Sequence, residues 1–138
     1  MDLLGAFPRA YDLFGDRSFY LLDKPGHMAG HLAGLAQTSP GEWVFMGGDC
    51  CHHRALLEGT RPVSVTIGPT GGTSGLHRDP ATAIRTIGLI RQLEGYEHVF
   101  VALAHDAMLV DRMPLNGWKG SSWKKAIDDD VNRTYRAL

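Results

Sequence analysis

The chain contains only two cysteines in its 138 residues, and these two, Cys50 and Cys51, are adjacent. Neighbouring cysteines rarely pair with each other, so the sequence excludes a framework of disulfide bonds and fits a reducing compartment. The start of the chain lacks the basic segment and cleavage site of a signal peptide, and no apolar run is long enough to span a bilayer. We therefore expect a cytoplasmic protein.

A strong charge of either sign is also missing. The formal net charge is -1 at pH 7, which gives no reason to expect nucleic acid or a membrane as a partner. Hydrophobic residues make up 43% and charged residues 21%, values typical of a globular chain with a core. We expect a single domain over residues 1–138, with a flexible glycine-rich loop at 68–75 and a peripheral C-terminal tail at 126–138.

Short apolar segments with turn residues at their borders predict four strands. They cover residues 18–23, 32–36, 43–46 and 99–104, and a turn at 38–41 joins the second strand to the third. The last of them is continuously apolar, as expected of a strand that is buried on both faces. The chain therefore carries the strands of a sheet, one of which is expected to be buried on both faces.

One long segment has the pattern of a helix that packs on this sheet. It begins with Asp79 as the N-cap and Pro80 in the first turn, and it ends before Gly95. A shorter helix is expected around residues 54–58. The apolar residues of the long helix recur at helical spacing and predict its buried face; they are Ala83, Ile84, Ile87, Ile90 and Leu93. Strands and helices in this order indicate an α/β fold.

Three polar residues, His27, Asp49 and His105, lie just beyond the ends of apolar runs. Imidazole nitrogen and carboxylate oxygen are ligands of borderline divalent ions such as zinc, and a carboxylate can bridge two ions. In layered α/β folds, functional groups collect at strand ends. The three residues therefore predict a metal site, the alternative being loop side chains that form hydrogen bonds with the backbone.

The other histidines are interpreted as less specific. His52 and His53 are expected to be a solvated loop pair, with the alternative that they recruit an ion beside Asp49. His77 and His98 are interpreted as ordinary surface or helix-end residues.

Three further residues each have two interpretations. Asp106 is expected either to orient His105 or to cap the turn that follows. Cys50 and Cys51 are expected to be small buried hydrophobic residues, the alternative being a reactive thiol with a lowered pKa.

The order of the motifs resembles the C-terminal half of the metallo-β-lactamase fold. The segment Asp-Lys-Pro-Gly-His-Met-Ala-Gly-His at residues 23–31 is followed by a hairpin into Gly47-Gly48-Asp49, then by a helix and a strand ending at Ala104-His105-Asp106. The spacing is similar to that of lactonase-like and hydrolase-like members, including fungal ones, over roughly residues 7–125. The resemblance implies half of an αββα sandwich, with a mixed sheet that carries helices on one face.

The resemblance also implies roles for individual residues. His27 corresponds to a ligand of a first metal, Asp49 to a bridging carboxylate and His105 to a ligand of a second metal, with zinc as the implied ion. His31 corresponds to a supporting histidine. His52 occupies the position of a substrate-contacting tyrosine, and it is the predicted catalytic residue, which contacts the substrate or donates a proton to the leaving group.

The His-x-His-x-Asp-His motif that supplies the remaining ligands in this superfamily does not occur in the chain. Asp49 and His27 would give the first metal two protein ligands, and Asp49 and His105 would give the second metal two. Zinc sites usually have at least three protein ligands. Members of the superfamily pack two similar halves face to face, so a single half is expected to expose an apolar sheet face. We therefore expect weak metal binding, and either self-association or a partner that brings the N-terminal half.

Three hypotheses of function are consistent with these features. The first is metal-assisted hydrolysis of an ester, lactone or thioester, carried out together with the missing half. The second is a non-catalytic α/β module that binds another protein or a second copy of itself. The third is a thiol or redox role for Cys50 and Cys51 beside the histidines.

Overall fold

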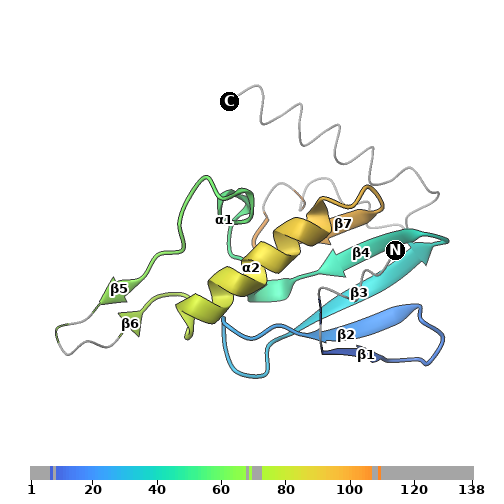
Figure 1. The fold of residues 1–138 in the computed structure, drawn as a ribbon, viewed down its shortest axis with the longest axis horizontal. Coiled ribbons are helices and arrows are strands. Elements are labelled where there is room, and N and C mark those ends of the chain that lie inside the picture. Colours follow the sequence, from blue (N-terminus) through green and yellow to red (C-terminus); the bar gives the residue numbers. More distant parts are fainter. Residues whose placement is uncertain (1–6, 8, 68, 70–72, 107–108, 110–138) are drawn as a thin grey trace.

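The chain forms a five-stranded mixed sheet with helices on one of its faces (Figure 1). The computed structural model describes residues 7, 9–67, 69, 73–106 and 109. The strands of the sheet, in spatial order, are β1 (Ala10–Asp12), β2 (Phe19–Asp23), β3 (Leu32–Ser39), β4 (Glu42–Met46) and β7 (Val99–Ala102). Neighbouring strands are antiparallel except β4 and β7, which are parallel. The predicted fold class, a mixed sheet with helices, is confirmed.

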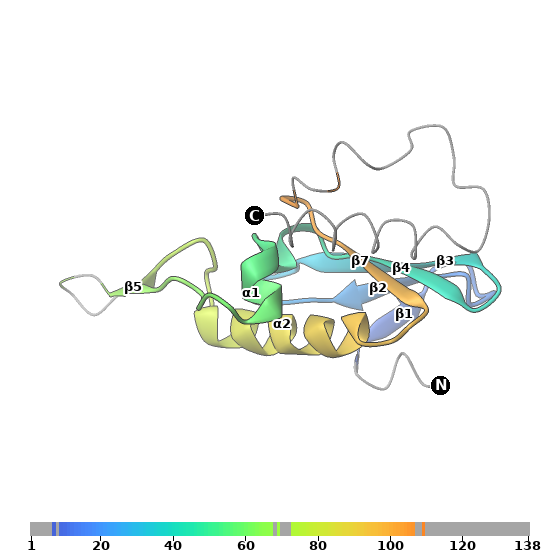
Figure 2. The ribbon, with the colours of Figure 1, turned by 90° about the horizontal axis from the view of Figure 1, so that it is seen from above.

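Short elements and two helices complete the described fold. They are the 3-10 helix η1 (Gly48–Cys50), the helices α1 (Arg54–Glu58) and α2 (Pro80–Glu94), and the short strands β5 (Thr66–Ile67) and β6 (Thr73–Ser74). Figure 2 shows α2 lying along one face of the sheet, with α1 beside it. No helix in the part of the chain that the structure describes is both long and apolar enough to cross a membrane.

Most predicted elements are present, with differences at their borders. β7 ends at Ala102, and the two residues before Asp106 form a turn rather than a continuation of the strand. Thr73–Ser74 pairs with Thr66–Ile67, so a short strand occurs where the sequence predicts part of a loop. β1 was not predicted, because its three residues are mostly exposed and carry no alternating pattern. The predicted tail at 126–138 lies outside the described residues.

Helix α2 begins and ends where the sequence predicts. The Asp79 side chain accepts a hydrogen bond from the backbone N–H of Thr82 at 3.0 Å, which is the expected N-cap contact. Its buried face differs at one position: Ile84 is exposed, because it lies about 100° around the helix from Ala83. Thr86 is buried in its place, and its hydroxyl donates to the carbonyl of Pro25 at 2.9 Å.

The core lies between α2 and the sheet. Its buried side chains come from alternate positions of β2, β3, β4 and β7, and from α1 and α2; they include Leu22, Leu35, Phe45, Val101, Leu57, Ile87 and Ile90. Each such side chain contributes about 1.5–3 kcal/mol to folding. A second, smaller cluster of Val44, Phe100 and Leu109 lies on the other face of the sheet, so β7 is buried on both faces as predicted.

Lys24, which follows β2, is an unusual member of the protein interior. Its side chain is only 4% exposed, and its ammonium lies 3.8 Å from the ring centroid of Phe7, a cation–π arrangement. Burial lowers the pKa of Lys24 to about 8, and the nearby Cys50 and Asp23 oppose this shift. A buried ammonium with a lowered pKa reduces stability at neutral pH.

Replacing Lys24 with methionine is therefore expected to raise the free energy of unfolding at pH 7, by about 1–3 kcal/mol after allowance for the lost cation–π contact. The folded-state pKa lies below the ordinary value of 10.5, so the unfavourable contribution is fully present below pH 8 and disappears as the pH rises through 10.5. Urea unfolding of both proteins at pH 7 and pH 10.5 measures this difference. An equal difference at both pH values would contradict the prediction.

Candidate metal centre

Loops at one end of the sheet carry five residues with metal-binding side chains. His27 lies in the turn between β2 and β3, Asp49 in η1 just after β4, and His105 in the turn just after β7. Because β4 and β7 are parallel, their carboxyl ends meet at the same edge of the sheet. His52 follows η1, and His77 precedes α2. The topology therefore gathers residues from distant parts of the sequence.

The structure brings together the three residues that the sequence predicts as ligands. The Nε2 atom of His105 lies 2.7 Å from Oδ1 of Asp49, and Nε2 of His27 lies 3.7 Å from Oδ2 of the same carboxylate. The His105 side chain is 58% exposed and that of His27 only 17%. The Asp49 carboxylate thus lies between two imidazoles, with His105 on the solvent side.

His52 and His77 extend this arrangement into a cluster of histidine rings. The ring centroid of His52 lies 4.9 Å from that of His27, 4.5 Å from that of His77 and 5.6 Å from that of His105. His77 is only 4% exposed, so its interpretation as a surface residue was wrong. His52 lies in a loop and is half-buried, and three other histidine rings lie close to it.

Sequence reasoning missed His77 because nothing in its local pattern shows where its loop runs. The loop returns to the cluster through backbone hydrogen bonds. The N–H of Arg78 donates to the carbonyl of His27 at 3.0 Å, and the N–H of Asp79 donates to the carbonyl of Gly26 at 3.0 Å. The position of His77 just before the N-cap of α2 is the only sequence signal, and it becomes informative once the packing of α2 is known.

Two groups of side chains in this cluster fit a metal ion. One consists of His27, His52 and His77, and the other of Asp49, His52 and His105; within each group the ligand atoms lie within 4.8 Å of one another. Among the described residues, four buried ring nitrogens of this cluster have no hydrogen-bond partner: Nδ1 of His27, Nδ1 of His52 and both ring nitrogens of His77. Buried polar atoms are normally paired. A coordinated cation would satisfy them, so the residues fit a metal.

The electrostatic environment favours neutral imidazoles, the form that binds metal. Burial lowers the pKa of His77 to about 4, with further lowering from His52 and His27. Burial is also the main cause of the lowered pKa of His52, followed by the charge of His27. Both rings are therefore neutral at pH 7.

His31 supports the site through the backbone of Asp49. The Asp49 N–H donates to Nε2 of His31 at 3.2 Å, so Nδ1 carries the ring proton and faces Sγ of Cys50 at 3.6 Å. Burial and the neighbouring His27 lower the pKa of His31, which keeps this ring neutral. This placement agrees with the supporting role that the sequence resemblance implies for His31.

Asp106 has a role that neither sequence interpretation included. Its carboxylate accepts hydrogen bonds from Nε and Nη2 of Arg54, at 3.2 and 3.1 Å. Arg54 also forms an ion pair with Glu94 at the end of α2 and donates to the carbonyl of Val101 in β7 at 3.4 Å. The turn that carries His105 is therefore connected to α1, α2 and β7 through one guanidinium group.

The remaining histidines and the cysteines lie outside the metal-binding groups. Nδ1 of His53 accepts from the N–H of Ala55 at 3.0 Å and caps α1, and His98 pairs with Glu42 on the surface. Both cysteines are buried, and burial raises the pKa of the Cys50 thiol to about 12 and also raises that of Cys51. A reactive thiol needs a lowered pKa. The structure therefore favours the interpretation of Cys50 and Cys51 as small buried hydrophobic residues.

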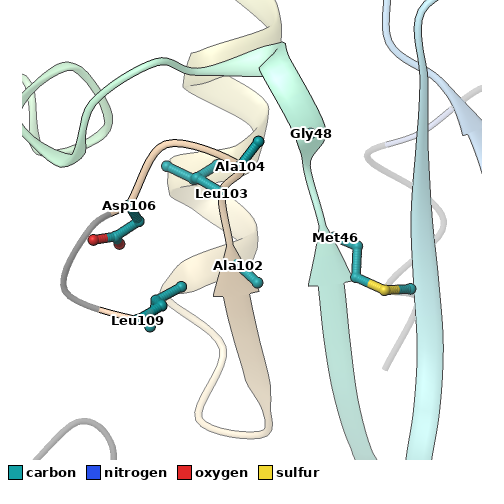
Figure 3. Close-up of a pocket in the computed structure, with 7 residues that line it drawn as sticks. All are labelled: Met46, Gly48, Ala102, Leu103, Ala104, Asp106 and Leu109. Atoms are coloured by element: carbon teal, nitrogen blue, oxygen red, sulfur yellow. The ribbon is translucent and has the colours of Figure 1, made fainter. Parts of the chain in front are cut away.

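A pocket of about 270 Å³ adjoins the same end of the sheet (Figure 3). It is mainly apolar, and its lining includes Gly48 and Ala104, which directly precede Asp49 and His105 in the sequence. The other lining residues are Met46, Ala102, Leu103, Asp106 and Leu109. An apolar pocket beside a few convergent polar groups is the usual form of a small-molecule site.

Several known proteins are similar in sequence to most of this chain. No family model matches the chain. Among curated proteins it is 42% identical over 142 residues to cytochrome P450 monooxygenase mpaDE' of Penicillium brevicompactum, a match that covers 88% of this chain and 16% of that protein. It is 36% identical over 152 residues to the metallo-hydrolase mfmC of Annulohypoxylon moriforme, which covers 83% of this chain and 40% of that protein.

A third relative is the gamma-lactamase FDB1 of Fusarium pseudograminearum, 29% identical over 161 residues, with 88% of this chain and 39% of that protein covered. The chain therefore spans between 16% and 40% of the length of these three relatives. The name monooxygenase belongs to a protein of which the match covers less than a fifth, so it assigns no chemistry to this segment.

Solved structures show the same fold. The chain superposes with a TM-score of 0.54 and 20% identity on an N-acyl homoserine lactone hydrolase whose product is bound at the catalytic metal centre, covering 72% of this chain and 34% of that one. A quorum-quenching N-acyl homoserine lactone lactonase gives a TM-score of 0.53 at 20% identity. The partial coverage is consistent with a C-terminal half. The chain therefore has part of the metallo-β-lactamase-type fold of these lactonases, and its relatives include a metallo-hydrolase and a gamma-lactamase.

Proposed function

We propose that the chain supplies metal ligands to a zinc-dependent hydrolase that acts on a small ester, lactone or thioester. The observation that carries this proposal is the Asp49 carboxylate, which lies between His105 at 2.7 Å and His27 at 3.7 Å. The names of its relatives and structural neighbours support it, because they describe a metallo-hydrolase, a gamma-lactamase and a lactone hydrolase. Lactams and lactones are both cyclic carbonyl compounds, so a carbonyl substrate is favoured.

The residues of this chain have distinct tasks in such a site. His27, Asp49 and His105 would hold the ions, which when bound supply Lewis-acid activation of water and of the substrate carbonyl. His31 fixes the backbone of Asp49. The apolar pocket beside Gly48 and Ala104 would accept the hydrocarbon part of a substrate whose carbonyl reaches the exposed His105.

Hydrolysis by the chain mixed with the N-terminal part of mfmC tests the proposal, because the chain alone gives each ion of a two-metal site only two protein ligands. With added zinc, we expect slow opening of an N-acyl homoserine lactone or cleavage of a simple ester or thioester, above the rate with zinc alone. Asp49→Asn is expected to lower this rate by about 100-fold or more, because it removes the shared carboxylate. His98→Ala, which changes an exposed histidine paired with Glu42, is the matched control. No turnover of any carbonyl substrate would overturn the proposal.

A second candidate is a non-catalytic module that binds the remaining part of a metallo-hydrolase fold. The observation that favours it is the sheet face opposite α2, where Leu32 and Met46 are 54% and 40% exposed. The chain matches only 40% of mfmC, so the rest of such a protein is the partner of fitting size and shape.

Sedimentation of the chain, alone and mixed with the N-terminal part of mfmC, tests this candidate. A one-to-one complex that is lost in Met46→Glu would support it. Self-association of the chain, or a monomer that does not respond to the added part, would overturn it.

A further inference from the structure

Three histidines, His27, His52 and His77, converge from separate parts of the fold on one point. They come from the β2–β3 turn, from the segment between η1 and α1, and from the loop before α2. One nitrogen from each ring lies within 4.8 Å of the others. Their ring centroids are between 4.5 and 5.6 Å apart. This spacing leaves room for one ion between three imidazoles.

The unpaired atoms in this group point to a ligand. Nδ1 of His27, Nδ1 of His52 and both nitrogens of His77 are buried without a hydrogen-bond partner. Buried polar atoms normally have a hydrogen-bond partner, so four unpaired atoms in one place point to a ligand that binds there. His77 gives the strongest indication of a bound ligand, because it is only 4% exposed and both of its ring nitrogens lack a hydrogen-bond partner.

The backbone holds the three rings in a fixed relation. Gly26 and His27 accept hydrogen bonds from the residues that directly follow His77, at 3.0 Å each. The next segment is fixed by Asp79, the N-cap of α2. His52 lies between η1 and the start of α1, which His53 caps. The site is therefore supported by helix ends and by a short backbone ladder, and such support favours preorganised coordination.

His52 belongs to both candidate groups, and burial distinguishes between them. The group with Asp49 and His105 has side chains that are 38% and 58% exposed. In the other group, His27 is 17% exposed at its side chain and His77 is buried. Imidazole is a preferred ligand of zinc, copper and nickel, and three histidines with an open fourth position form a complete catalytic zinc site.

We propose that this chain, without a further half, binds one divalent transition-metal ion through His27, His52 and His77. The inference rests on His27 as a metal ligand in the proposed function, but it gives His52 a coordinating role in place of the predicted contact with substrate. It also supplies the third protein ligand that His27, Asp49 and His105 cannot provide to either ion of a two-metal site.

Calorimetric titration of the purified chain with Zn²⁺ is the first measurement that tests the proposal. The second is a count of the histidine ligands in the Co²⁺-loaded chain. We expect one ion per chain and an affinity loss of about 100-fold or more in His77→Phe, which retains a ring of similar size in the buried position. Asp49→Asn and His105→Ala are expected to lower the affinity less than His77→Phe does, because neither residue belongs to the three-histidine group. His98→Ala is the control for loss of an exposed histidine.

Paramagnetically shifted imidazole signals in the Co²⁺-loaded chain give the second measurement. Signals from three histidines are expected, whereas the group of Asp49, His52 and His105 would give signals from two. Circular dichroism of each metal-free variant shows whether the fold is retained. Loss of the ion in His105→Ala with full binding in His77→Phe would overturn the inference and leave the proposed hydrolase site intact. Absence of any bound ion would overturn the inference, whereas the hydrolase proposal is decided by the separate carbonyl-substrate assay.

Discussion

Arg54→Met is expected to lower the free energy of unfolding by about 3–5 kcal/mol, the usual effect of removing one partner from a buried ion pair. The Arg54 side chain is 12% exposed and bonds to the Asp106 carboxylate, which is 4% exposed, and to Glu94. Without the guanidinium group, Asp106 would be a buried carboxylate without its arginine partner. Since small domains have a total stability of about 5–15 kcal/mol, this loss removes a large share of the free energy that keeps the chain folded.

Urea unfolding of the variant and of Arg85→Met measures this effect. Arg85 is the matched control, because it is an exposed arginine on α2 whose side chain bonds to Thr82. The control is expected to change stability by less than about 0.5 kcal/mol. Arg54→Lys retains the charge but not the several directed N–H groups, so an intermediate loss is expected. A loss below about 1 kcal/mol in Arg54→Met would show that the ion pairs contribute little.

Gly26→Ala is expected to destabilise the chain by about 2–5 kcal/mol and to weaken metal binding. Gly26 has a φ of +127°, which side-chain-bearing residues rarely adopt, and a Cβ atom there would lie 2.5 Å from the backbone nitrogen of Ala83. The turn must therefore move away from α2. His27 is the next residue and would move with it, away from His77 and Asp49.

Gly30→Ala provides a close control for this substitution. Gly30 lies in the same β2–β3 connection and has a φ of +76°, but a Cβ atom there would meet nothing within 4 Å. The expected loss is therefore about 1–2 kcal/mol, from the backbone conformation alone. Chemical denaturation and zinc titration of both variants separate the effect of backbone strain from that of the steric clash with Ala83. Equal losses in the two variants would show that the contact with Ala83 is not what fixes the position of His27.

The sequence predicted those parts of the fold that local chemistry determines. The N-cap at Asp79 and the first residue of α2 depend on neighbouring residues in the sequence, and both are observed as predicted. The buried face of α2 was less accurate, because the choice between Ile84 and Thr86 depends on where the β2–β3 turn passes the helix. Local periodicity does not contain that information.

The same distinction applies to the site. His27, Asp49 and His105 follow strand ends, so their approach could be predicted from the order of the elements. His77 could not be identified, because its position depends on hydrogen bonds between its loop and a turn that is distant in sequence. The pairing of Asp106 with an arginine on α1 was not predicted either, because it joins segments that are distant in sequence. Residues that act through long-range packing are the ones that sequence patterns identify least well.

The parallel pairing of β4 with β7 has a consequence for folding. Parallel neighbours cannot be joined by a tight turn, and here both helices and the β5–β6 pair lie between them in the chain. Contacts across such a long connection are slow to form, because the entropy of closing the loop is lost before they can offset it. Asp49 and His105 follow these two strands, so the shared carboxylate meets its second imidazole only when the sheet gains its last strand. An ion that needs both residues would bind after folding is nearly complete and would slow unfolding rather than speed folding.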